Sequence, residues 1–302
     1  MKRCLVALVS FGVLFTASAS VYLYLTNLPA YAASEFPTTP LQDSNLTIGS
    51  VPIDKVSYSG DSAHFSADPD QNYASKLDQY AFTLRTQVEN NFNLEDTNKE
   101  LSHCKSLIYR TLQSLPKAHV GKLKNLTLIF SENARRGLGG GTSVYLRCEN
   151  ISDSELVAVM VHEIGHITDS TVLTGNIIAG TSAFLDGNNP VYNNDSSLNF
   201  YQISFENEKT IRYAGLEADF VSGYAMTDPF EDFAETYAFY LLHGNEFRAM
   251  AQNNPALSQK YFFMKYSVFA GKEYLNGDLK NTASRNFDVT VLSYDLGKFF
   301  AV

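Results

Sequence analysis

Positive charge is scarce in this 302-residue sequence, because 32 Asp and Glu outnumber 23 Lys and Arg. The formal net charge at pH 7 is −9, and the sequence pI is about 5.1. A chain with this balance lacks the basic surface that binds nucleic acid or anionic lipid. We therefore expect no nucleic-acid partner. The apolar fraction of 45% is ordinary for a globular protein with a sizeable core.

Several functional signatures are also missing. The sequence contains no Gly-x-Ser-x-Gly elbow, so nothing in it indicates a serine hydrolase of that type. The glycine run Gly137–Gly141 is not followed by Gly-Lys-Ser/Thr, and a strand pattern rather than a helix comes next. That order excludes a phosphate-binding loop. No internal repeat is present, which argues against a repeat architecture.

The first 32 residues contain no acidic residue, and their two basic residues stand at the start. Residues 1–32 begin with Lys2 and Arg3 and contain an apolar run over 4–25. Small-residue patterns typical of a cleavage site, Ala-Ser-Ala and Ala-Tyr-Ala, lie within or just beyond this run. The segment predicts a signal peptide, or a membrane anchor through residues 4–25 if it is retained. Either alternative places the remaining chain outside the cytoplasm, secreted or anchored at the cell surface.

Cysteine is scarce as well, with three in the chain. One of them belongs to the N-terminal segment, which leaves Cys104 and Cys148 as an even pair. Disulfides persist in exported proteins, so this pair predicts a bridge. Two buried free thiols are the alternative, and the sequence does not decide between them.

Breaker residues and apolar periodicity divide the rest of the chain. We expect a linker or loosely ordered arm over 33–70, a main domain over 71–275 and a C-terminal tail over 276–302. Within the domain the patterns predict, in order, helices over 73–88 and 101–115, a strand over 125–130, a glycine-rich turn over 137–141, a strand over 142–148, a long loop over 174–210, and helices over 229–243 and 255–268.

One helix carries the residues that point to metal chemistry. The sequence Val-His-Glu-Ile-Gly-His contains His162, Glu163 and His166, and the capping pair Ser152 and Glu155 precedes it. Positions four apart share a helix face, so both imidazoles can reach one ion. Apolar residues on nearly every side of this helix predict that it is central and buried. Because the chain has only six histidines, we favour a metal site over a chance match.

A catalytic zinc ion takes three protein ligands and one water, so a third ligand is needed. The longer His-Glu-x-x-His-x-x-Gly-x-x-His pattern is not met, since Asp169 and Val172 replace its last glycine and histidine. A carboxylate is therefore expected, and the later helix offers Glu231, Asp232 and Glu235. Glu231 and Glu235 are four apart, so one can bind the ion while the other orients a histidine. Glu231 also fits a helix cap with Asp228.

The segment Gly-Tyr-Ala-Met-Thr-Asp-Pro-Phe-Glu-Asp-Phe-Ala-Glu over 223–235 resembles the catalytic segment of anthrax lethal-factor-type metallopeptidases, a gluzincin family. The resemblance covers roughly residues 125–245. It implies that Glu231 is the third ligand and that Tyr224 stabilises the oxyanion. It also implies that Glu235 lies behind the ligands and supports them without binding the ion. The separation of 65 residues between His166 and Glu231 is long for gluzincins.

The resemblance also implies a fold. We expect an α+β, zincin-like metallopeptidase domain with a small mixed sheet, an active-site helix and a mainly helical C-terminal part. It further implies an edge strand over 139–145 that pairs with the substrate backbone. The substrate-binding residues would then be Gly139, Gly140, Gly141 and Val144.

These expectations combine into one functional hypothesis. The chain is predicted to be an extracytoplasmic endopeptidase with one Zn²⁺, in which Glu163 activates the attacking water and Tyr224 stabilises the oxyanion. Its substrates would be proteins, peptides or cell-wall peptide crosslinks, and its oligomeric state is not predicted. The alternative is a non-catalytic cell-surface binding or assembly module that retains a structural zinc site. A precursor inhibited by residues 33–70 is a further variant of the first hypothesis.

Overall fold

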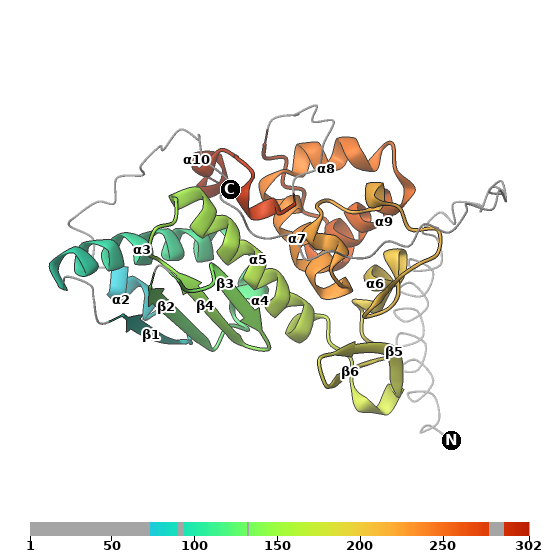
Figure 1. The fold of residues 1–302 in the computed structure, drawn as a ribbon, viewed down its shortest axis with the longest axis horizontal. Coiled ribbons are helices and arrows are strands. Elements are labelled where there is room, and N and C mark those ends of the chain that lie inside the picture. The colour runs from blue at the N-terminus through green and yellow to red at the C-terminus, as the bar shows by residue number, and fades with distance from the viewer. Residues whose placement is uncertain (1–72, 90–93, 132, 278–286, 302) are drawn as a thin grey trace, which may run out of the picture. The chain divides into compact units, whose positions relative to one another are not determined.

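A computed structural model describes residues 73–89, 94–131, 133–277 and 287–301 (Figure 1). The expected export segment over 1–32 and the linker over 33–70 lie outside these residues. All described residues belong to one compact unit, Ser59–Val302. Across this part of the chain, no helix combines the length and the apolar character that a membrane span requires.

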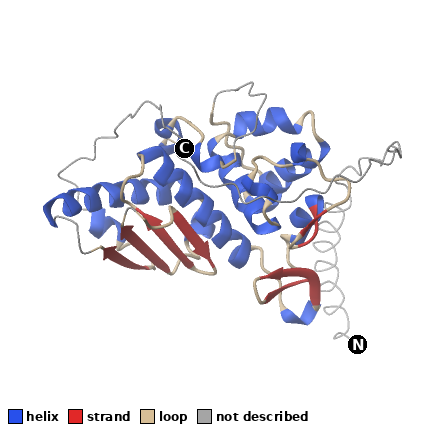
Figure 2. Cartoon of the chain, viewed as in Figure 1, coloured by secondary structure: helices blue, strands red, loops and turns tan. Residues whose placement is uncertain are grey.

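One half of the described structure contains a small mixed sheet with helices packed beside it (Figure 2). Its strand order is β1-β2-β4-β3. The strands are β1 (Thr83–Val88), β2 (Asn125–Phe130), β3 (Gly137–Gly140) and β4 (Ser143–Arg147). β1, β2 and β4 run parallel, whereas β3 is antiparallel to β4 and forms one edge. Together with the helices, this makes the structure mixed α+β.

The prediction of one helix over 73–88 is wrong. Only α2 (Tyr73–Leu77) is helical, and Thr83–Val88 forms β1 along the parallel strand β2. The apolar stripe fits a helix, but the second half also contains two threonines and a valine, which favour a strand. Backbone pairing with β2 therefore overrides the helical periodicity.

The glycine run is also different from its prediction as a turn. Gly137–Gly140 forms the edge strand β3, and the turn itself is limited to Gly141 and Thr142. Gly141 has φ +55°, which lies in the left-handed region that favours glycine. The segment expected as one edge strand over 139–145 is therefore a tight hairpin of two strands. Only β3 lies at the edge of the sheet, and β4 lies between β2 and β3.

The long loop expected over 174–210 is largely ordered structure. It contains a hairpin of β5 (Thr181–Asp186) and β6 (Asn189–Tyr192), the helix α6 (Leu198–Ser204) and the short strand β7 (Phe205–Asn207), which pairs with β8 (Thr210–Ile211). Its polar composition hides a few large buried side chains, among them Phe184 and Phe200. These anchors stabilise elements that are otherwise rich in Asn, Gly and Ser.

The helix expected over 101–115 and the helix expected around the His-Glu-Ile-Gly-His motif are both present. α3 (Leu94–Ser114) ends before Pro116 and lies beside α5 (Asp153–Val172), which packs on β3 and β4 (Figure 1). The Ser152 side chain accepts a hydrogen bond from the Glu155 N–H and so caps α5.

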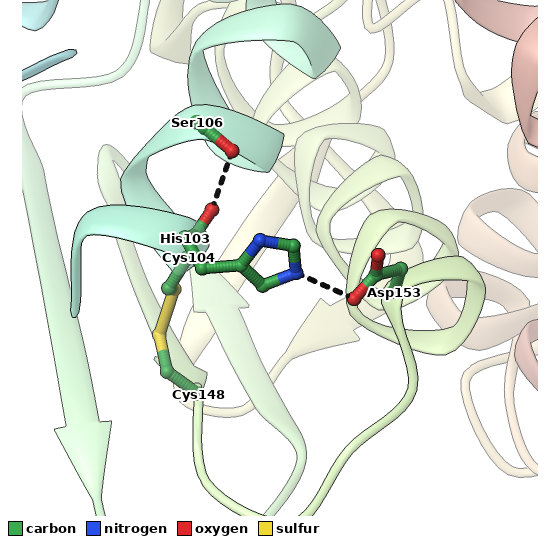
Figure 3. Close-up of a disulfide and its surroundings, with 5 residues drawn as sticks. All are labelled: His103, Cys104, Ser106, Cys148 and Asp153. Carbon is green, nitrogen blue, oxygen red and sulfur yellow. Dashed lines mark hydrogen bonds and ion pairs between the residues drawn. A yellow bond between two sulfur atoms is a disulfide. The ribbon is translucent and has the colours of Figure 1, made fainter. Parts of the chain in front are cut away.

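The two remaining cysteines were expected to form either a bridge or two free thiols. The structure contains the disulfide between Cys104 and Cys148, which joins α3 to the end of β4 (Figure 3).

The second half is mainly helical. It consists of α7 (Pro229–Leu242), α8 (Gly244–Ala251), α9 (Pro255–Phe263) and a π-helical extension over Met264–Val268. Asp228 caps α7 by accepting hydrogen bonds from the N–H groups of Phe230 and Glu231, as its sequence predicts. In the region expected as a tail, a 3₁₀ turn (Val289–Val291) and α10 (Leu296–Phe300) bury Val289 and Phe299 in the same core.

α5 and α7 cross in close contact at Gly165. A Cβ added to Gly165 would lie 3.1 Å from Ala234 Cα and 3.2 Å from Tyr237 Cβ. Any larger side chain there would push the two helices apart, because buried interfaces have no spare volume. This contact lies between the two histidines of α5 and places the first turns of α7 beside them.

The short helix α4 (Lys117–Val120) contributes a buried histidine to this core. His119 Nδ1 lies 2.9 Å from the Tyr237 hydroxyl, and Nε2 lies 3.2 Å from the carbonyl oxygen of Val268. A neutral imidazole satisfies both contacts, with Nε2–H donating to the carbonyl. Burial lowers the pKa of His119 to about 4.

We predict that His119 makes folding stability sensitive to acid. The unfolded state takes up a proton near pH 6.5, whereas the folded state does so near pH 4, so stability decreases as the pH falls through this window. The expected loss from this residue is about 3 kcal/mol. Urea unfolding from pH 7 to pH 4 should show a flatter profile for His119→Gln than for the parent. If the stability of both proteins fell equally between pH 7 and pH 4, His119 would not be the source of the acid sensitivity.

Candidate metal centre

Two helices and one turn supply the site. α5 carries His162, Glu163 and His166, and the start of α7 carries Glu231 and Glu235. A 3₁₀ turn directly before α7, Tyr224–Met226, adds the tyrosine. The structure therefore brings the residues of α5 together with residues that lie 58 or more positions later in the sequence.

The three expected ligands converge. His162 Nε2 and His166 Nε2 lie 3.2 Å apart, and Glu231 Oε2 lies 3.2 Å from the first nitrogen and 3.3 Å from the second. Four ligands held about 2.0 Å from a tetrahedral zinc ion are separated by about 3.3 Å, so the observed spacing fits zinc. Among the described residues, no other group of three His, Cys, Asp or Glu side chains has this arrangement.

The protonation pattern also fits a cation. His162 Nδ1 lies 2.9 Å from Glu235 Oε1, so we assign the proton to Nδ1 and the lone pair to Nε2. Glu231 Oε2 is buried and faces the Nε2 atoms of both histidines. Two imidazole nitrogens and a carboxylate oxygen thus face one point, where a metal cation would be held by all three.

The contacts of each carboxylate show which one lies where a third metal ligand is needed. Asp232 faces away from the histidines and pairs with the fully buried Lys260 at 2.6 Å. Asp228 caps α7 alone, because the Glu231 side chain extends to the histidines instead. Burial raises the pKa of Glu231, but contacts with His162 and His166 outweigh it and keep the pKa below its usual range. The ionised Glu231 carboxylate therefore favours a positive charge beside it, which a metal ion or a protonated histidine can supply.

Glu235 is completely buried beneath His162. Its Oε2 accepts hydrogen bonds from the Ser222 hydroxyl at 2.6 Å and from the Val289 N–H at 2.9 Å. Its Oε1 faces His162 Nδ1, so the carboxylate orients that imidazole. In metal sites, a carboxylate commonly accepts the second ring N–H of a metal-binding histidine in this way. Ser222 and Val289 were not expected from the sequence, because neither belongs to a recognisable motif.

Glu163 lies against the edge strand. Its side chain is buried, and a Cβ added to Gly139 would lie 2.5 Å from Oε2, while one added to Gly137 would lie 2.3 Å from Oε1. Burial raises the pKa of Glu163, although the nearby histidines and the Gly139 N–H, which donates to the carboxylate, act in the opposite direction. A carboxylate with a raised pKa is suited to accept and return a proton.

Tyr224 reaches the site from the other side. Its hydroxyl donates a hydrogen bond of 3.1 Å to Glu231 Oε1, and its ring packs against those of His162 and Phe287, with centroid distances of 6.2 Å and 5.8 Å. Burial, and then the charge of Glu231, raise the pKa of the phenol above its usual value. Tyr224 therefore stays protonated and can act as a hydrogen-bond donor.

The expected substrate-binding residues fall into two groups. Gly139 and Gly140 lie on the edge strand β3, and Gly141 lies in the adjoining turn. Val144 is different, because it lies on the inner strand β4 with its side chain in the core. Its backbone faces other strands of the sheet, so the edge available to a peptide belongs to β3.

Asp169, near the end of α5, has two polar partners from another helix region. It is buried and accepts hydrogen bonds from the Ser197 hydroxyl and from the Tyr201 hydroxyl, the latter at 2.6 Å. Burial raises the pKa of Asp169 to about 7. These contacts attach α6 to the end of α5, and the sequence gives no signal for them because the partners are about 30 residues away.

A family described as "putative zinc-binding metallo-peptidase" matches residues 153–288. The matched region begins with α5, includes the Tyr224 turn and the whole of α7, and so contains every residue of the cluster. At this coarse level, the chain is similar to zinc-binding metallopeptidases. No curated protein and no solved structure matches the chain.

We predict that the glycines of β3 keep Glu163 in place. Gly139→Ala should lower the free energy of unfolding by about 1–3 kcal/mol, because the new Cβ overlaps the Glu163 carboxylate. Gly140→Ala is the matched control, since its Cβ would meet no atom within 4 Å. In a Glu163→Ala background, Gly139→Ala should cost less but still something, because the added Cβ also lies 3.0 Å from the carbonyl oxygen and 3.1 Å from the Cβ of residue 163. Equal costs in both backgrounds, measured by urea unfolding, would contradict this contact.

Proposed function

We propose that this chain is an extracytoplasmic zinc-dependent endopeptidase of the lethal-factor-like gluzincin type, with a zincin-like fold. The observation that carries the proposal is the convergence of His162, His166 and Glu231 with Glu163 beside them. The similarity to zinc-binding metallopeptidases over residues 153–288 supports the same reaction class.

The donor set suits a catalytic rather than a structural ion. A structural zinc site has four protein ligands, whereas a catalytic site has three and leaves a position for water or substrate. Three donors make up the cluster within the described residues. Zinc held there would act as a Lewis acid that polarises the scissile carbonyl and lowers the pKa of water.

Glu163 is the residue that moves protons. Its carboxylate takes one proton from the attacking water as the oxygen–carbon bond forms. It then returns a proton to the amide nitrogen as the carbon–nitrogen bond breaks, so the products are a carboxylic acid and an amine. The raised pKa and the fixed position against β3 both favour this exchange.

Tyr224 stabilises the negative charge that develops on the carbonyl oxygen. Its hydroxyl is protonated and adjacent to Glu231, so a small movement directs it from that carboxylate to the substrate oxygen. The exposed edge of β3 is available to pair with an extended peptide next to Glu163. This edge favours proteins, peptides or cell-wall peptide crosslinks as substrates.

The location outside the cytoplasm rests on two features. Residues 1–32 carry the export pattern described above. The disulfide between Cys104 and Cys148 is the second, because such bridges are rare in reducing compartments. The proposal leaves open whether the N-terminal segment is removed or retained as an anchor.

We predict that Glu163→Gln lowers the cleavage rate by 10²–10⁴-fold while zinc remains bound, because the amide cannot accept the proton. Tyr224→Phe should lower kcat by about 10²-fold or more with little change in zinc content. Exposed positions provide the controls Glu206→Gln and Tyr213→Phe.

Cleavage is best followed with a mixed peptide library, in which mass spectrometry counts the newly formed termini. Zinc-dependent new termini in the parent and none in Glu163→Gln would support the endopeptidase. A zinc-loaded parent that forms no new termini, or a Glu163→Gln protein as active as the parent, would instead favour the non-catalytic binding module.

A further inference from the structure

A short C-terminal segment touches the residues that surround the metal cluster. We call residues 287–290 the C-terminal strap. The Phe287 carbonyl accepts a hydrogen bond of 2.6 Å from the Tyr224 N–H, and the two rings pack at 5.8 Å. The Val289 N–H donates to Glu235 Oε2 at 2.9 Å. The strap therefore contacts both the tyrosine and the carboxylate that orients His162.

An arginine far away in the sequence holds the strap. Arg136 directly precedes β3, and its Nη2 forms an ion pair with Asp288 Oδ2. Its Nη1 donates to Glu155 Oε1 at 2.9 Å and to the Thr290 hydroxyl at 3.0 Å. Both carboxylates are mostly buried, with side-chain exposures of 10% for Glu155 and 12% for Asp288. We call Arg136, Glu155, Asp288 and Thr290 the arginine clasp.

The strap is also rigid within itself. Asp288 Oδ1 accepts hydrogen bonds from the Thr290 N–H at 2.7 Å and from the Thr290 hydroxyl at 2.6 Å. This places the Val289 N–H, which lies between them, in a fixed direction toward Glu235. One guanidinium bound to two carboxylates and a hydroxyl gives a defined geometry that a flexible lysine does not reproduce.

The clasp joins three elements that each position part of the site. Arg136 precedes the edge strand that holds Glu163, and Glu155 lies in the first turn of the histidine helix α5. Asp288 belongs to the strap that holds Tyr224 and Glu235. A continuous chain of contacts thus runs from Arg136 through Asp288, the Val289 N–H and Glu235 to His162.

We propose that Arg136 is a positioning residue for the metal centre, acting through the strap on Glu235 and Tyr224. The inference rests on the proposed function, but its first consequence is zinc affinity rather than turnover. Residues that orient a metal-binding histidine change metal affinity about 10–100-fold when they are lost. Breaking the clasp frees the strap, so Glu235 keeps the hydrogen bond from Ser222 but loses the one from Val289 and holds the His162 imidazole less firmly.

The test compares three clasp variants with a matched ion-pair control in metal-free and zinc-loaded full-length protein. Arg136→Leu removes the clasp, Arg136→Lys keeps the charge without the fork, and Thr290→Val removes only a hydroxyl. The control is His103→Gln, because His103 Nε2 pairs with Asp153 at 2.7 Å near the same end of α5 but outside the clasp (Figure 3).

We expect Arg136→Leu to raise the zinc Kd about tenfold in chelator competition. Arg136→Lys and Thr290→Val should each have a smaller effect, and the visible spectrum of the Co²⁺ form should change in Arg136→Leu. His103→Gln should lower the Tm of the metal-free protein without changing either readout. If Arg136→Leu does not fold, Thr290→Val still decides the question.

The proposal is overturned if the clasp variants and His103→Gln lower Tm alike while every zinc Kd stays within twofold of the parent. That result would make the clasp purely structural. Its failure is distinct from that of the proposed function, because a parent that binds zinc but cleaves no peptide would contradict only the latter. A folded parent that binds no zinc would overturn both.

Discussion

The close crossing of α5 and α7 is the contact on which the rest of the site depends. Gly165 lies between the two histidines, and the absence of a side chain there lets the backbone of Ala234 approach α5. The first turn of α7 then faces the histidine pair, so Glu231 and Glu235 meet His162 from two sides. The candidate metal centre therefore depends on helix packing, and Gly165 within His-Glu-Ile-Gly-His allows the close approach.

Burying so many charges at this crossing requires partners for each of them. Glu235 has no contact with water and accepts hydrogen bonds from Ser222 and Val289. Asp232 lies one position after the expected ligand and is neutralised by a lysine that is also completely buried. Unpaired charges in such positions cost several kcal/mol. Glu231 Oε2 faces the Nε2 atoms of His162 and His166, and a cation bound between these three atoms would neutralise its charge.

The sequence predicts the parts of this arrangement that depend on local spacing. The histidines four apart, the Asp228 cap and the strand over 125–130 follow from periods and capping rules, and the structure contains each of them. Long-range contacts are different. β1 adopts a strand because β2 lies beside it, and the region over 174–210 is ordered by a few buried aromatic rings. Arg136 and the C-terminal strap meet across about 150 residues, which no local pattern signals.

The central claim is that His162, His166 and Glu231 together bind one zinc ion. The most direct measurement is zinc per chain by elemental mass spectrometry, after dialysis of the purified protein against trace zinc, beside Glu231→Gln. The account predicts about one zinc in the parent and clearly less in the variant, because the amide is a weaker ligand than the carboxylate. A folded parent without zinc, or equal zinc in both proteins, would contradict it.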